Sequence, residues 1–264
     1  MMRNARAALR PIWILAMIWL LNGCASKNAK SLANGLSVAN RNVEGRSPTM
    51  ADSPELSRMV LKAAAKPLAP VEGGGWQSLF DGQTLAGWQV TDFREHGAVR
   101  CESGLIVVGQ GASLTGINWT NNIPKVDYEI VLDAMRLQGT DFFCGLTLPV
   151  GETHCTLILG GWGGRIVGIS SINGDDASDN QTSQNFEFES ERWYHVRVRV
   201  TGAKIQAWLD QQEIVNLDTT GLKITMRFGD IELSKPLGVA TWKTTGAIRG
   251  IKIRRLESAT EMKK

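Results

Sequence analysis

The stretch WYHVRVRVTGAKIQAWLD, residues 193–210, decides the fold class of this chain. Two sets of side chains alternate along its first half: Tyr194, Val196, Val198 and Val200 in one set, and Trp193, His195, Arg197 and Arg199 in the other. The second half sets Ile205, Ala207 and Leu209 against Lys204, Gln206, Trp208 and Asp210. A period of two is typical of a strand with one buried face, and TGAK (201–204) has the composition of a hairpin turn. The stretch therefore predicts an antiparallel hairpin whose apolar face belongs to a core.

The same alternation recurs on both sides of this hairpin. YEIVLDAM (128–135) and IRGIKIRRL (248–256) follow it, and helical periodicity is almost missing between residues 76 and 256. Many strands joined by Gly-rich turns are typical of an antiparallel sandwich or jelly roll. We expect an all-β fold, a two-sheet antiparallel jelly-roll sandwich, for which about 180 residues provide an ample core.

The N-terminus has the pattern of an export signal. Basic MMRNARAALR (1–10) precedes the apolar run PIWILAMIWLL (11–21), which is too short for a membrane-spanning helix and fits a signal peptide. LNGC (21–24) resembles a bacterial lipobox, in which Cys24 becomes the lipidated first residue; the alternative is an ordinary signal peptide with a Cys at its cleavage site. We expect a lipid-anchored protein of the bacterial cell envelope, with Ala25 favouring the outer membrane.

The charge distribution excludes one class of partner. The chain has a formal net charge of +3, and Arg3, Arg6 and Arg10 supply three positive charges in the first 23 residues, which leaves +3 − 3 = 0 for the remainder. A near-neutral protein has no general electrostatic attraction to nucleic acid or to an anionic membrane face. We therefore expect no nucleic-acid partner, and membrane contact through the lipid anchor only.

Changes in composition divide the chain into four segments. We assign residues 1–23 to the signal peptide, 24–74 to a flexible tether, 75–257 to the jelly-roll domain and 258–264 to a tail. Within the tether, DSPELSRMVLKAAAK (52–66) predicts one short helix with Asp52 or Ser53 as its cap and Pro54 in its first turn. PLAPVEGGG (67–75) ends this helix before the domain begins.

Several landmarks of the domain resemble the 3-keto-disaccharide hydrolase family. WQSLFDGQTLAGWQV (76–90) is similar to the family's opening Phe-Asp-Gly-x-Thr-Leu-x-Gly-Trp, and RWYHVRVRVTGAKIQAWLDQQEI (192–214) is similar to its Trp-rich hairpin. Further resemblance lies in VRCESGLIVVGQGASLTG (99–116), VDYEIVLDAMRL (126–137) and PLGVATWKTTGAIRGIKIRRL (236–256). The resemblance implies a concanavalin A-like jelly roll and activity on glycosides already oxidised at C3 of the sugar.

That activity has a clear chemical requirement. A ketone at C3 acidifies the C2–H, so a general base removes this proton, the aglycone leaves C1 and water adds back. The family carries a Tyr-Glu-x-Gln strand and a closing Gly-Leu-Gln-x-His-Gly. This chain has Cys155 and Leu157 at the Glu and Gln positions, and Trp242 and Lys243 near the missing closing Gln and His. The implied activity therefore has to use other polar groups.

The Gly-rich stretch LILGGWGGRIVG (157–168) is a candidate sugar site. It lacks the spacing of a phosphate loop. Trp162 can stack on a sugar ring and Arg165 can donate hydrogen bonds; the alternative is a Trp at the edge of the core and a solvated Arg. Asp141 is the best carboxylate for acid–base chemistry, with a turn Asp as its alternative. We predict Asp141, His154 and Arg165 as the catalytic group, and Trp162, Trp242 and Lys243 as substrate-binding residues.

Two histidines leave alternatives open. His154 and His195 can each act as a general base, since imidazole titrates near neutrality, or each can be a polar residue on a sheet face. The polar face that carries His195, Arg197, Arg199, Lys204, Gln206 and Trp208 either lines a saccharide surface or is solvated or covered by a loop.

The sequence also leaves alternatives open for metal binding and for disulfide bonding. NGDDASDN (173–180) is either a calcium loop or a solvated acidic loop, and its spacing is not that of an EF-hand. Cys144 and Cys155 flank a predicted turn and are either bridged or free thiols. We predict no cofactor, with a divalent cation as an option.

Three functions remain as hypotheses. The first is an exported enzyme that hydrolyses or eliminates the glycosidic bond of 3-keto-glycosides. The second is a non-catalytic saccharide-binding module, which the missing Glu and Gln favour. The third is a structural envelope lipoprotein with no small ligand. A saccharide or glycoside ligand is common to the first two.

Overall fold

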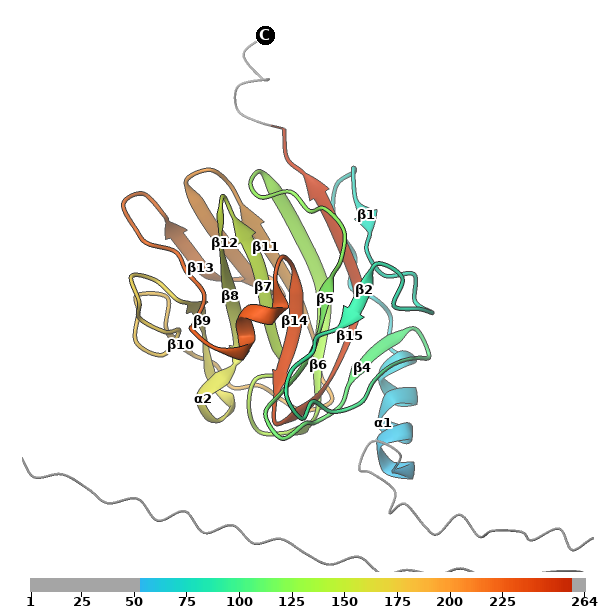
Figure 1. The fold of residues 1–264 in the computed structure, drawn as a ribbon. Coiled ribbons are helices and arrows are strands. Elements are labelled where there is room, and N and C mark those ends of the chain that lie inside the picture. The colour runs from blue at the N-terminus through green and yellow to red at the C-terminus, as the bar shows by residue number, and fades with distance from the viewer. Residues whose placement is uncertain (1–52, 258–264) are drawn as a thin grey trace, which may run out of the picture. The chain divides into compact units, whose positions relative to one another are not determined.

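A computed structural model describes residues 53–257, and two antiparallel sheets of these residues face each other across one core (Figure 1). The first sheet, here called sheet A, contains β1 (Gln77–Ser78), β3 (Val99–Glu102), β4 (Leu105–Val108), β6 (Tyr128–Gly139), β11 (Trp193–Val200), β12 (Lys204–Leu209), β13 (Gln212–Asp218) and β15 (Thr244–Arg255). The second, sheet B, contains β2 (Trp88–Val90), β5 (Leu114–Trp119), β7 (Cys144–Val150), β8 (Thr153–Gly160), β9 (Ile166–Ser170), β10 (Gln184–Asn185) and β14 (Gly238–Trp242).

The chain passes repeatedly between the two sheets, which is the arrangement of a jelly roll. Sheet A has the order β13-β12-β11-β6-β15-β4-β3, with β1 beside β15, and sheet B has the order β10-β9-β8-β7-β14-β5-β2. The chain runs from β2 in sheet B to β3 and β4 in sheet A, returns with β5, crosses again with β6, and closes with β14 in sheet B and β15 in sheet A. This confirms the predicted two-sheet antiparallel sandwich.

The hairpin of residues 193–210 forms as its alternation predicts. Every second residue of β11 and β12 is buried, and Val196 lies opposite Leu209 while Val200 lies opposite Ile205. The buried set enters the central core with residues of sheet B such as Leu146. The alternate set points to the outer face of sheet A.

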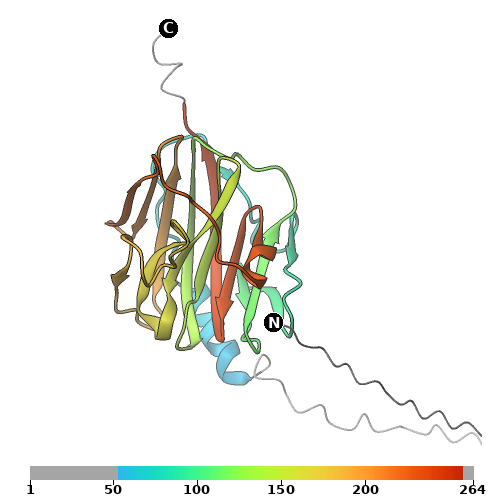
Figure 2. The same cartoon turned by 60° about the vertical axis from the view of Figure 1, so that its left-hand side comes forward.

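A helix covers one half of that outer face. The helix α1 (Pro54–Ala64) begins at Ser53, whose Oγ accepts a hydrogen bond from Leu56 N at 3.1 Å, and Pro54 occupies its first turn as predicted. Its apolar stripe of Leu56, Val60 and Ala63 packs on outward-facing residues of sheet A: Leu105, Val107, Met135, Leu137 and Ala247. Figures 1 and 2 show α1 against the β4 side of this sheet.

The segment assigned to the tether therefore needs a correction over its second half. Residues 53–74 belong to the folded unit, because the helix buries an apolar stripe and the chain after it hydrogen-bonds to sheet A. The predicted signal peptide, Cys24, the first part of the tether and the C-terminal tail lie outside the described residues. No helix within residues 53–257 combines the length and the apolar character needed to cross a membrane.

The Gly-rich stretch forms a β-hairpin of sheet B, in which β8 pairs with β9. A short turn, α2 (Gly161–Gly164), joins β8 to β9. Gly164 has φ +100°, and a Cβ at this residue would lie 2.5 Å from Thr140 O. Glycine is therefore required where the turn packs against the β6–β7 connection.

Cys144 and Cys155 are free thiols in the core, which settles the alternative left by the sequence. They lie on neighbouring strands, but each is opposite a leucine: Cys144 faces Leu159, and Cys155 faces Leu148. Burial raises the pKa of both thiols to about 12. Both behave as small apolar core residues.

Candidate functional site

The open half of the outer face of sheet A contains a pocket of about 690 Å³, within the usual volume range of small-molecule sites. One wall is a segment that follows α1, residues 66–76, here called the strap. Its residues in the wall are Ala69, Pro70, Val71, Glu72, Gly73 and Trp76. The floor consists of Val131, His195, Arg197 and Arg254, and the opposite wall of Trp208, Asp210 and Gln211.

Two buried carboxylates on β6 organise the floor. Glu129 and Asp133 point to the outer face of the sheet and are 0% and 3% exposed. Each lies between cationic or imidazole side chains on the neighbouring strands: Arg199 on β11 and Arg254 on β15 are in register with Glu129, and His195 on β11 and Arg249 on β15 are in register with Asp133. Opposite charges at directly paired positions stabilise a sheet, and buried charges of this kind require such partners.

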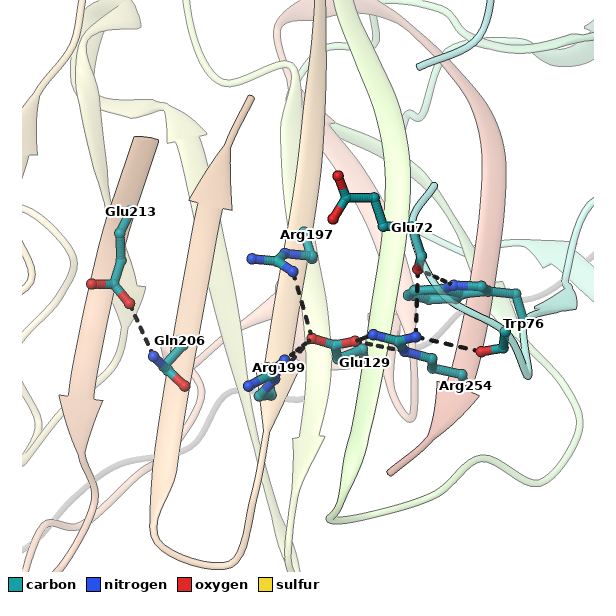
Figure 3. A network of polar contacts seen from close by, with 9 residues as sticks. Glu72, Trp76, Glu129, Arg197, Arg199, Gln206, Glu213 and Arg254 are labelled. Carbon is teal, nitrogen blue, oxygen red and sulfur yellow. Dashed lines mark hydrogen bonds and ion pairs between the residues drawn. The ribbon is translucent and has the colours of Figure 1, made fainter. Parts of the chain in front are cut away.

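Glu129 holds three arginines (Figure 3). Its carboxylate accepts hydrogen bonds from Arg199 Nε at 2.8 Å and Arg254 Nε at 2.7 Å, and Arg197 Nη1 lies 3.9 Å from it. One negative charge beneath three positive charges leaves this part of the floor electropositive. The arginines are therefore fixed in place without being neutralised.

Asp133 orients His195. Its Oδ1 lies 2.8 Å from His195 Nδ1, and its Oδ2 accepts a hydrogen bond from Arg249 Nε at 3.2 Å. Because a carboxylate can only accept, Nδ1 carries the proton of the neutral imidazole and Nε2 keeps a lone pair. The His195 side chain is 18% exposed and lines the pocket. An imidazole with a carboxylate behind it and a pocket before it is the usual arrangement of a general base.

Arg197 and Trp208 form the side of the floor opposite the strap. The Arg197 guanidinium lies 3.9 Å from the centre of the Trp208 indole, a stacking arrangement that fixes the cation. Its side chain is 34% exposed, so N–H donors remain for a ligand. Trp208 itself offers an apolar surface of the kind on which sugar rings stack.

The strap is attached at both of its ends. At the first end, Arg249 donates to Lys66 O at 2.6 Å and to Pro67 O at 2.5 Å, and Ala69 N donates to Asp133 at 3.3 Å. Asp133 therefore positions both the pocket histidine and the pocket wall.

At the second end, Trp76 and Arg254 hold the strap (Figure 3). Trp76 Nε1 donates to Glu72 O at 3.0 Å, and Arg254 Nη1 lies 3.4 Å from both Glu72 O and Gly74 O. The Arg254 guanidinium also stacks on the Trp76 ring, 4.5 Å from its centre. The strap then continues into β1, which pairs with β15.

The six residues predicted as the site lie elsewhere. None of Asp141, His154, Trp162, Arg165, Trp242 and Lys243 lines this pocket. Asp141 accepts hydrogen bonds from Phe142 N at 2.8 Å and Gly163 N at 3.1 Å, which brings it next to the turn that carries Trp162. Asp141 thus adopts the backbone-bonding role of a turn residue, and its part in chemistry stays a prediction.

The other five form no single cluster. Trp242 lies near the same turn, since its N donates to Phe142 O, and Lys243 Nζ lies 5.8 Å from the Trp242 ring. Arg165 forms an exposed ion pair with Glu187 at 2.6 Å. His154 is the second residue of β8, whereas Trp162 follows the far end of this strand. At about 3.3 Å per residue, the strand separates His154 from the other predicted residues.

Asp133, Glu129, Arg254 and the strap were not predicted as site residues. One signal was present: Glu129 and Asp133 interrupt the otherwise apolar first part of β6, residues 128–135. The partners of these carboxylates depend on strand register and could not be read from β6 alone.

In the acidic loop, residues 173–180, the carboxylate of Asp176 is bound by neighbouring side chains of the protein. Asp176 accepts hydrogen bonds from Ser170 Oγ and Ser171 Oγ, each at 3.0 Å, and pairs with Arg227. Across residues 53–257 no group of three His, Cys, Asp or Glu side chains is placed to hold a metal ion.

Comparison with solved structures shows the fold. A transglycosylase, Crh5, in complex with NAG is 12% identical, with a TM-score of 0.50 over 74% of this chain and 91% of that chain. A protein from Parabacteroides distasonis proposed to be a glycosyl hydrolase is 15% identical over 69% and 94% of the two chains, with a TM-score of 0.46. The carbohydrate-binding module CBM66 from Bacillus subtilis is 9% identical over 64% and 95%, with a TM-score of 0.42.

Comparison of sequences shows the family. No curated protein sequence matches the chain. Residues 75–254, however, match the family described as the 3-keto-alpha-glucoside-1,2-lyase-like domain, in agreement with the resemblance found in the opening and hairpin motifs. The match covers most of the chain and nearly the whole sandwich. The chain therefore belongs to the 3-keto-alpha-glucoside-1,2-lyase-like domain family.

Proposed function

We propose that this chain is a carbohydrate-active enzyme that cleaves 3-keto-glycosides, and that the pocket on sheet A is its active site. The observation that carries the proposal is the pair of His195 and Asp133 at 2.8 Å, on the floor of a pocket beside Arg197. Family membership supports the substrate class.

The reaction requires a general base and a group that stabilises the enolate, and the pocket residues fit both requirements. His195 Nε2 accepts the C2 proton while Asp133 stabilises the resulting imidazolium. The C2–H electron pair moves toward the C3 carbonyl oxygen, and Arg197 donates to the developing enolate oxygen. The enolate then re-forms the ketone, a C1–C2 double bond forms and the C1–O bond breaks.

The remaining steps return the proton and complete hydrolysis. The departing aglycone oxygen takes a proton from the imidazolium or from water. Water then adds its oxygen to C1 and a proton returns to C2, which yields the free 3-keto-sugar. The net reaction consumes one water and needs no oxidant.

The test is an assay of the purified chain with 3-keto-trehalose or a 3-keto-glucoside, with divalent cations supplied. Loss of a general base lowers the rate by roughly 10²–10⁴-fold, so we expect His195→Gln to lower kcat/KM by at least about 100-fold. His96→Gln, in a turn outside the pocket, is the matched control. Cleavage that is absent in the wild type, or unchanged in His195→Gln, would overturn the proposal.

The set predicted from sequence is a rival site in the same assay. If Asp141→Asn or His154→Gln abolished cleavage while His195→Gln did not, catalysis would belong to sheet B. The pocket assignment and the chemistry are thus tested separately.

A non-catalytic saccharide-binding module is the second candidate. The observation that favours it is that Cys155 and Leu157, at the family's Glu and Gln positions, are buried in the core and offer no polar group. This candidate requires binding of 3-keto-sugars or unoxidised sugars without turnover, measured by calorimetry. Weaker sugar binding in Trp208→Ala would then identify the same pocket as a binding site.

Export and lipid anchoring at Cys24 are part of the proposal. The lipobox-like LNGC (21–24) supports them. Loss of membrane association in Cys24→Ser is the expected result, and an unchanged membrane fraction would contradict the anchor.

A further inference from the structure

The strap is a wall of the pocket that lies mostly outside the family domain. The family match begins at residue 75, yet residues 69–73 line the pocket. Hydrogen bonds from Arg249 and Arg254 and to Asp133 fix the strap on the sheet, so the wall is part of the folded structure. The shape of the pocket therefore depends on a segment that the shared domain does not include.

The position of the strap limits which ligands can cross the sheet. Its contacts with Asp133 on β6 and with Arg249 and Arg254 on β15 place it over these two strands. Beyond it, α1 covers the outer face near β4. A sugar chain lying across sheet A is thus blocked on the β15 side, whereas beyond Trp208 the outward side chains of β13, Glu213 and Asn216, are exposed to solvent.

The strap also supplies a carboxylate. Glu72 lines the pocket, and its side chain is directed away from the strap (Figure 3). Its carbonyl oxygen is held by Trp76 and Arg254, while no side-chain hydrogen bond or ion pair of Glu72 occurs within residues 53–257. The other pocket carboxylate, Asp210, is engaged by His195 N at 2.9 Å and Arg192 at 2.8 Å.

We infer that the strap is the specificity wall of this pocket: it restricts the site to short glycosides and chain ends, and Glu72 binds hydroxyl groups of the terminal sugar. A free carboxylate accepts hydrogen bonds from two neighbouring hydroxyls, which is the pattern that a sugar ring presents. The inference rests on the proposed function in so far as the pocket takes a saccharide.

The first experiment measures binding by calorimetry on the full chain, with a 3-keto-disaccharide as the probe. Hydrogen bonds to charged groups are among the stronger ones, so we expect Glu72→Gln to weaken binding by about tenfold. Glu213→Gln is the matched control, because Glu213 is an exposed carboxylate of the same sheet outside the pocket. An unchanged affinity in Glu72→Gln would overturn the assigned role of Glu72.

The second experiment compares ligands on the unaltered protein, so that it does not depend on how a variant folds. The linear disaccharide has chain ends, and a cyclic oligosaccharide of the same sugar has none. We expect the linear ligand to bind at least about tenfold more tightly. Equal affinity for the cyclic ligand would overturn the restriction to chain ends.

The outcomes separate this inference from the proposed function. Binding that depends on Glu72 without any cleavage would contradict the proposed enzyme activity and support the specificity wall. Cleavage that is insensitive to Glu72→Gln, with equal use of linear and cyclic ligands, would contradict the specificity wall and support the enzyme activity. Binding of neither ligand would overturn both.

Discussion

The Gly160–Arg165 turn of sheet B and the pocket of sheet A use polar residues in different ways. Beside the turn, Asp141 accepts hydrogen bonds from Phe142 N and from Gly163 N of the turn, and Arg165 pairs with Glu187 in solvent. In the pocket, buried carboxylates hold Arg197, Arg254 and His195, which line the cavity. A polar residue is available to a ligand where another buried group fixes it, and a residue that satisfies its own backbone is much less available.

The two histidines show the same difference. His195 has a carboxylate partner, Asp133, at 2.8 Å. His154 has no such partner among residues 53–257, and its pKa is lowered by burial and by the positive charges of Lys235 and Lys125. A carboxylate stabilises an imidazolium that has taken up a proton, whereas two lysines disfavour it. Chemistry that charges a histidine therefore fits the pocket better.

The largest expected effect comes from removing the charge beneath the pocket. Glu129 is fully buried among Arg197, Arg199 and Arg254, and breaking a buried ion pair typically costs about 3–5 kcal/mol. Because these arginines are partly solvated, we expect Glu129→Gln to lower the free energy of unfolding by about 3 kcal/mol. Chemical denaturation measures it, with Glu213→Gln as the exposed control.

An equal effect of the two substitutions would contradict the difference drawn between the pocket and the turn of sheet B. If Glu129→Gln and Glu213→Gln had equal stability, the carboxylate would not be organising the floor. The arginines would then be independent surface side chains, as the solvated alternative for this face holds.

The fold could be predicted because alternation is a local property. The alternation with a period of two is visible within residues 193–210 alone. The apolar residues of this alternation are the ones that β11 and β12 bury. The helix was equally readable, since Ser53, Pro54 and an apolar stripe are all close in sequence. What could not be predicted was that this stripe finds a binding face on β4, β6 and β15.

The site could be predicted only in part, because it is assembled by register. His195, Arg197 and Trp208 were recognisable as one polar face. Asp133 meets His195 only because β6 and β11 pair in one register, and a shift of one residue would turn the carboxylate into the core. The strap was assigned to a tether, since nothing in PLAPVEGGG indicates that arginines 182 residues away hold its carbonyl groups.

A smaller effect is expected at the turn of sheet B. Trp162 has φ 48° and ψ 56° and is 43% exposed. Left-handed backbone costs a non-glycine residue about 1–2 kcal/mol, so we expect Trp162→Gly to raise the free energy of unfolding by about 1 kcal/mol. Trp162→Ala is the matched control because it keeps the Cβ and the strain. Thermal denaturation of the three proteins measures the difference.

This variant also tests the turn as a sugar platform. With the pocket on sheet A as the site, Trp162→Gly leaves disaccharide affinity unchanged in calorimetry. A loss of affinity with retained stability would show that the strained Trp serves a ligand, and the turn would then join the pocket as a functional region.

The smallest effect concerns the pH dependence of stability at His154. Its pKa is lower in the folded state than the ordinary value of about 6.5, so the unfolded chain binds a proton more readily between these two values. The contribution of neutral His154 to the free energy of unfolding is therefore fully present above about pH 6.5. It is lost as pH falls through that value toward the pKa of the folded state. We therefore expect the Tm of the wild type to fall relative to the Tm of His154→Gln when the pH is lowered from 8 to 5. A shift in the opposite direction would mean that His154 is stabilised in its charged form by an acidic partner, and the contrast with His195 would disappear.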